Sequence, residues 1–145
     1  MKPVLSLRIA SALTFLHAVL HTIGGVLSAP APGAQLAAVA AMKANPFPIM
    51  GTTRSYWDFT LGYGLAIGLF LLMESVVFWQ LGSLAKAGAP SLRPVLATFF
   101  AGYLIFAAIS CQYFFAAPAI TEILIALCLG VAILKSRPGA STAVR

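Results

Sequence analysis

The stretch RSYWDFTLGYGLAIGLFLLMESVVFWQ, residues 54–80, decides the fold of this chain. Trp57 and Trp79 lie 22 residues apart, which is ~33 Å along an α-helix and suits a slightly tilted crossing of a bilayer. Tryptophan favours both membrane–water interfaces, and most residues between these two are apolar. The stretch therefore predicts a membrane-spanning helix over 55–80, with Asp58 near one end and Glu74 near the other.

The composition of the whole chain agrees with this assignment. Its 145 residues are 61% hydrophobic and 8% charged, with a mean hydropathy of +0.97, whereas a soluble domain has roughly 25% charged residues. The net charge of +6 lies in tails and loops and forms no basic patch interleaved with aromatic residues, which excludes nucleic acid as a partner. The composition predicts an integral protein of the lipid bilayer.

Three more apolar stretches predict further spans, over 4–28, 94–115 and 119–135, the last two joined by a tight turn at 116–118. Residues 4–28 resemble a signal peptide, but the run is longer than a usual apolar region of one and holds two histidines, which favours a retained helix. Residues 29–53 are too poor in large apolar residues to span, and predict an exterior loop with a short interfacial helix over 35–44. The expected fold is all-α, a polytopic four-transmembrane-helix bundle forming a single transmembrane domain over 1–145.

The distribution of basic residues predicts the orientation of this bundle. With four spans, one side of the membrane receives Lys2, Arg8, Lys86, Arg93, Lys135, Arg137 and Arg145. The other side receives only Lys43 and Arg54. Since cytoplasmic loops carry the excess of Lys and Arg, both termini are expected in the cytoplasm (N-in/C-in) and the 29–53 loop outside.

The few charged or reactive groups inside the spans need partners there. Arg8 and Glu74 lie at similar depths near the cytoplasmic side, which predicts a structural ion pair between them or snorkelling of both to headgroups. Cys111 and Cys128 would lie at unequal depths in adjacent antiparallel helices. They are expected to be buried free thiols, because a disulfide requires close Cα atoms.

A second group of polar residues gathers near the outer surface. His17 and His21 are spaced i, i+4 and share one helix face with Ser6, Ala10, Leu13, Thr14, Gly24 and Ser28. Such a small and polar stripe is expected to face protein rather than lipid. All four helices contribute to the resulting outer-leaflet cluster, which comprises His17, His21, Arg54, Asp58, Gln112 and Glu122.

The outer-leaflet cluster has four interpretations. His17 and His21 with Asp58 and Glu122 form a candidate site for a divalent metal such as Zn²⁺ or Cu²⁺. Haem is a second possibility, with at most one histidine as axial ligand. The third is a proton relay or a pocket for a small lipophilic ligand, and the fourth is purely structural, with imidazoles hydrogen-bonded between helices.

Two local patterns have structural explanations of their own. Ser55 or Thr53 can cap the helix that RSYWDF opens, and Asp58 in its first turn favours the positive end of the helix dipole. Gly64 and Gly68 form a GxxxG pattern that predicts close contact with another helix.

HAVLHTIGG (17–25) and PFPIMGTTRSYWDFTLGYG (46–64) resemble motifs of a family of small, uncharacterised bacterial four-helix integral membrane proteins. That resemblance implies the fold and a location in the bacterial inner membrane, and carries over no catalytic residue. In size and helix count the chain is also similar to DoxX-like membrane proteins.

Two functional hypotheses follow. In one, the protein is a subunit or scaffold of a membrane complex, with other membrane subunits or further copies of itself as partners. In the alternative, it is a binding protein or enzyme that uses the outer-leaflet cluster for a metal or a small lipophilic ligand, with a histidine as ligand or general base. The sequence has no phosphate loop or nucleophile elbow, which argues against nucleotide hydrolysis.

Overall fold

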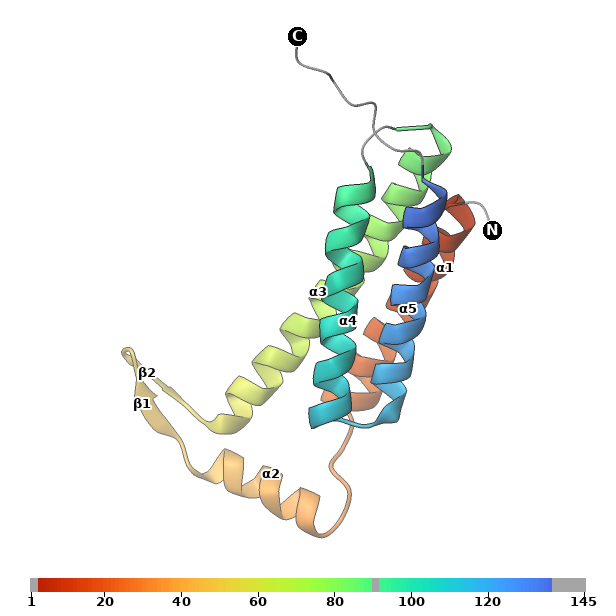
Figure 1. Cartoon of the computed structure of the whole chain (residues 1–145). Helices are drawn as coiled ribbons and strands as arrows, with labels where there is room; N and C mark the ends of the chain where they lie inside the picture. Colours follow the sequence, from red (N-terminus) through yellow and green to blue (C-terminus); the bar gives the residue numbers. More distant parts are fainter. Residues whose placement is uncertain (1–2, 90–91, 137–145) are drawn as a thin grey trace. The chain divides into compact units, whose positions relative to one another are not determined.

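The computed structural model of the protein describes residues 3–89 and 92–136, so Lys2, Arg137 and Arg145 of the charge count lie outside the described residues. In chain order the elements are α1 (Pro3–Val19), the π-helix η1 (Leu20–Val26), α2 (Ala34–Ala44), β1 (Phe47–Ile49), β2 (Thr52–Arg54), α3 (Tyr56–Lys86), α4 (Leu92–Tyr113) and α5 (Ala116–Lys135) (Figure 1). Four helical stretches are long and apolar enough to cross a membrane: Pro3–Val26, Tyr56–Lys86, Leu92–Tyr113 and Ala116–Lys135. The predicted all-α, multi-pass membrane fold is confirmed, as is the short helix between the first two spans.

Helix α3 continues beyond the predicted end at residue 80 and includes Gly82. A Cβ atom at Gly82 would lie 3.6 Å from Leu7 Cβ, an ordinary van der Waals distance, so Gly82 lies where α3 faces α1. The helix ends at Lys86, and Gly88 just beyond it has a φ of +73°, which suits a residue that follows a helix C-terminus. Gly88 N–H donates to Ala85 O and Ala89 N–H to Leu84 O, which together satisfy the last carbonyl groups.

The predicted tight turn at 116–118 is wrong, because these residues form the first turn of α5. Phe115 is the extended residue that precedes the helix, with φ −136° and ψ 174°. Pro118 therefore lies in the first helical turn, where a missing N–H costs no hydrogen bond. The connection between α4 and α5 consists of Phe114 and Phe115 alone.

The first span changes from α-helix to π-helix at Leu20. Leu27 N–H donates to Thr22 O over 2.9 Å, an i→i+5 bond that belongs to the wider π turn. The prediction of a protein-facing stripe is correct for Ser6 and Thr14, which are buried. It is wrong for Gly24 and Ser28, which are exposed, because the wider turn shifts their side chains away from the 100° spacing of an α-helix.

A small hairpin that the sequence analysis did not predict occupies the end of the 29–53 loop. β1 and β2 pair antiparallel, with Phe47 opposite Arg54. Met50 and Gly51 both have positive φ, 45° and 78°, as two-residue hairpin turns of the primed type require. The Phe47 ring lies 5.0 Å from Tyr56 and 6.1 Å from Phe59, between centroids, which attaches the hairpin to the start of α3.

The chain divides into two compact units, Met1–His17 with Leu71–Arg145, and Ala18–Phe70. The first unit, here called the bundle unit, has a core drawn from four helices: Leu7 and Ala10 of α1, Phe78 and Leu81 of α3, Leu92, Leu96 and Tyr103 of α4, and Ile125, Ala126, Leu129 and Ala132 of α5. The second, the loop unit, contains η1, α2, the hairpin and the first half of α3.

The predicted GxxxG contact is present in the loop unit, where η1 packs against α3. His21 Nε2 lies 2.9 Å from Gly64 O. A Cβ at Gly64 would come within 2.7 Å of Val26 Cγ2, and one at Gly68 would clash with Thr22 Oγ1. The two glycines therefore allow η1 to lie directly on the backbone of α3.

Gly68→Ala is expected to destabilise the protein by about 1–3 kcal/mol, because the added methyl group displaces Thr22. Thermal unfolding in detergent, followed by circular dichroism, measures the effect. Gly62→Ala is the matched control, since a Cβ there meets nothing within 4 Å. Equal stability of the two variants would contradict the close contact at Gly68.

Candidate functional site

The most enclosed acidic group of the described residues is Glu122, on α5 of the bundle unit, 1% exposed. Ser110 Oγ, on α4, donates to Glu122 Oε1 over 2.9 Å. The second carboxyl oxygen, Oε2, is buried and has no hydrogen-bond partner within the described part of the chain. A carboxyl group in this position costs free energy in an apolar bundle, and such groups are therefore candidate functional sites.

Glu74 on α3 accepts a hydrogen bond from a second buried group. Tyr103 OH, on α4, donates to Glu74 Oε2 over 2.7 Å, and Thr14 Oγ1, on α1, lies 3.4 Å from the same hydroxyl. Tyr103 is 3% exposed and Thr14 fully buried. Three helices of the bundle unit thus meet at the Tyr103 hydroxyl group.

The Ser110–Glu122 pair and the Tyr103–Glu74 pair lie along the same face of α4, at different depths. Tyr103 and Ser110 are seven residues apart on α4, so they share a face and differ in depth by ~10 Å. Tyr103 is also close enough to Glu122 for an electrostatic interaction. On α1, Ser6 lies closer to the N-terminus than Thr14 and is also fully buried. Its hydroxyl has no hydrogen-bond partner among residues 3–89 and 92–136. We call this set the polar file: Glu122, Ser110, Tyr103, Glu74, Thr14 and Ser6.

Arg8 and Glu74, which the sequence analysis pairs, have other partners in the structure. Arg8 Nη2 donates to Ser83 Oγ over 2.9 Å, and its guanidinium carbon lies 3.4 Å from the centroid of the Trp79 ring. Ser83 is nine residues beyond Glu74 on α3, or ~13 Å along the axis. Arg8 therefore lies closer to the end of α3 than the predicted ion pair requires, while Glu74 lies at the level of Tyr103.

The two predicted histidines belong to different units. His17 is buried in the bundle unit at 9% exposure. His21 belongs to the loop unit, and its contact with Gly64 O supports the interpretation of this imidazole as a link between helices.

Asp58 lies in the first turn of α3, Arg54 just before this helix, and Gln112 in the last turn of α4. Asp58 Oδ2 accepts hydrogen bonds from Ser55 N and Ser55 Oγ, at 2.7 and 2.9 Å. This is a capping box at the start of α3, so the predicted cap by Ser55 is confirmed. Arg54 is exposed and donates to Thr53 O, while Gln112 is exposed on α4. The structure thus gives Asp58 a capping role, while the Arg54 side chain bonds to the carbonyl group of the preceding residue, Thr53.

Residues 3–89 and 92–136 contain no group of three or more His, Cys, Asp or Glu side chains placed to hold a metal ion. The metal set of His17, His21, Asp58 and Glu122 stays a prediction from the sequence, as does haem. Cys111 and Cys128 are free thiols as predicted, but Cys111 is exposed rather than buried.

Comparison of the chain with protein-family models, curated proteins and solved structures finds no match in any of the three. What the structure and composition establish is an integral membrane protein whose described residues include four helices able to span a bilayer.

Proposed function

We propose that this protein moves protons within the bacterial inner membrane, with Glu122 and Glu74 as its proton-binding groups. The observation that carries the proposal is the enclosure of Glu122, 1% exposed with Oε2 unpartnered among the described residues. A group so enclosed is reached by a proton or a water molecule more readily than by any larger ligand. Intramembrane acids aligned with hydroxyl groups are typical of proton relays.

The polar file supplies the groups that such a relay needs. Glu122 Oε2 takes up a proton, while Ser110 holds Oε1. Tyr103 OH is already hydrogen-bonded to Glu74 and passes its proton to Oε2 of that carboxylate. The Tyr103 oxygen accepts a second proton in exchange, which comes from Glu122. Because Tyr103 and Ser110 differ in depth by ~10 Å, water molecules must bridge them.

Proton flux into vesicles tests this proposal. The protein is reconstituted in liposomes containing a pH-sensitive dye, and a potassium diffusion potential drives protons across. Wild type is expected to acidify the lumen faster than empty vesicles do. Glu122→Gln keeps the size and the Ser110 contact but cannot release a proton, so we expect flux to fall by about 10²-fold or to the empty-vesicle rate.

Asp58→Asn is the matched control, because it removes the third acid of the chain and asparagine also caps helices well. Its flux should equal that of wild type. Flux no greater than in empty vesicles for the wild-type protein would refute the proposal and leave the role of a subunit or scaffold of a membrane complex. Equal loss in Asp58→Asn would show that the effect does not depend on the polar file.

A further inference from the structure

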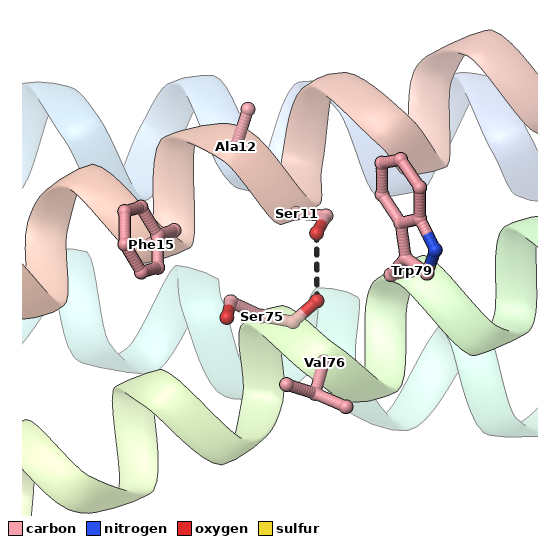
Figure 2. A pocket seen from close by; sticks show the side chains of 6 residues that line it. All are labelled: Ser11, Ala12, Phe15, Ser75, Val76 and Trp79. Carbon is pink, nitrogen blue, oxygen red and sulfur yellow. Dashed lines mark hydrogen bonds between the residues drawn. The ribbon is translucent and has the colours of Figure 1, made fainter.

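An open groove lies on the outside of the bundle unit, where α1 and α3 pack together. It is lined by Ser11, Ala12, Phe15, Ser75, Val76 and Trp79, and has a volume of about 290 Å³. Ser11 Oγ donates to Ser75 O over 2.7 Å and forms the floor, while Phe15 and Trp79 stand at opposite ends (Figure 2). Since the Ser11 hydroxyl bonds to the backbone, the surface offered to a ligand is mainly apolar.

The Trp79 end of the groove carries a positive charge. The Arg8 guanidinium stacks on the Trp79 ring at 3.4 Å and donates through Nη2 to Ser83. Its Nη1 is buried and has no hydrogen-bond partner in the described part of the chain. Arg8 as a whole is only half-buried, and a phosphate oxygen is the acceptor that pairs best with arginine.

The depth of these groups fits the shape of a phospholipid. Arg8 is five residues from Pro3, the first residue of α1, and therefore ~8 Å from the helix start. Trp79 beside it is 55% exposed, as expected of an interfacial tryptophan. Along α1 the groove runs inward from Ser11 to Phe15, which is four residues or ~6 Å, parallel to the direction that an acyl chain takes. Arg8 precedes Ser11 by three residues, so it lies about one turn before the start of the groove.

We propose that this groove binds one anionic phospholipid, with its phosphate on Arg8 and an acyl chain over Ser11, Ala12 and Val76. The basic character of the predicted cytoplasmic side favours an anionic rather than a zwitterionic headgroup. The proposal is independent of proton movement, since none of these residues belongs to the polar file.

Native mass spectrometry of the full chain in mild detergent tests the site, with phosphatidylglycerol and phosphatidylcholine of identical acyl chains as probes. Wild type is expected to retain one phosphatidylglycerol molecule in preference to phosphatidylcholine. Ala12→Phe fills the groove from an exposed position and should weaken retention about tenfold or more. Arg8→Gln should remove the preference for phosphatidylglycerol, because the charge-assisted hydrogen bond is lost.

Two controls separate the groove from general effects. Ala101→Phe adds the same side chain at an exposed position of α4, and Lys86→Gln removes a charge at the end of α3. Both should retain phosphatidylglycerol as wild type does, and inorganic phosphate should not displace the lipid. Equal binding of both lipids by wild type, or undiminished binding by Ala12→Phe, would overturn the proposal. So would a dimer of this chain that Ala12→Phe dissociates, since a second copy would then occupy the groove.

Discussion

Phe78→Ala is expected to lower the free energy of unfolding by about 3–5 kcal/mol, the usual cost of removing a buried aromatic side chain from a core. Phe78 is fully buried in the bundle unit. Its ring packs edge-on against Phe99 at 5.1 Å and lies 5.9 Å from the ring of Tyr103, between centroids. The substitution therefore leaves a cavity that α3 and α4 cannot close without moving together.

The position of Phe78 also makes it a support for the candidate site. Tyr103 is held on one side by the Phe78 ring and on the other by its bond to Glu74. Loss of the ring frees Tyr103 to tilt, so we expect Phe78→Ala to reduce proton flux as well as stability.

Titration with sodium dodecyl sulfate, followed by circular dichroism, measures the change in stability. Phe114→Ala is the matched control, because Phe114 is 63% exposed between α4 and α5; its expected effect is within about 0.5 kcal/mol. If the two variants unfolded at the same detergent fraction, Phe78 would not be part of the core.

The spans were predictable because hydropathy over twenty residues depends on composition and not on tertiary detail. The predicted helix boundaries were wrong at glycine and proline, because both residue types occur in turns and also in helices. The span predicted to end at residue 80 continues through Gly82 to Lys86, and the turn predicted at 116–118 is the first turn of α5, with Pro118 in it. Single-sequence patterns do not separate these uses, because packing partners far along the chain decide between them.

The candidate site was predicted only in part. Glu122 was named, because a charged residue in an apolar helix is conspicuous, whereas Ser110 and Tyr103 were not. A signal for both was present: Ser110 and Glu122 lie at similar distances from the connection at 114–115, and Tyr103 precedes Ser110 by seven residues. The contact of His21 with Gly64 depends on the π-helix, for which the sequence offers only the Gly24–Gly25 pair.

Replacement of Ser110 and Glu122 together is expected to separate the fold of the bundle unit from its proposed function. Ser110→Ala alone deprives Glu122 Oε1 of its donor, which should cost about 1–3 kcal/mol of unfolding free energy because the acceptor stays buried. Adding Glu122→Leu removes that acceptor and the unpartnered Oε2 with it. The double variant should regain the stability of wild type or exceed it, since apolar replacement of both partners is often neutral or stabilising.

Stability and flux of the double variant, measured on the same preparation, should therefore respond differently. The double variant should withstand as much heat as wild type and conduct no protons, because its bundle holds no carboxyl group at position 122. If the Ser110–Glu122 hydrogen bond serves only to hold the helices together, the double variant should instead be as unstable as Ser110→Ala. Undiminished flux in the double variant would show that protons bypass Glu122. A stable but inactive double variant would mean that a costly buried acid is retained for its chemistry, as expected where function and stability are in conflict.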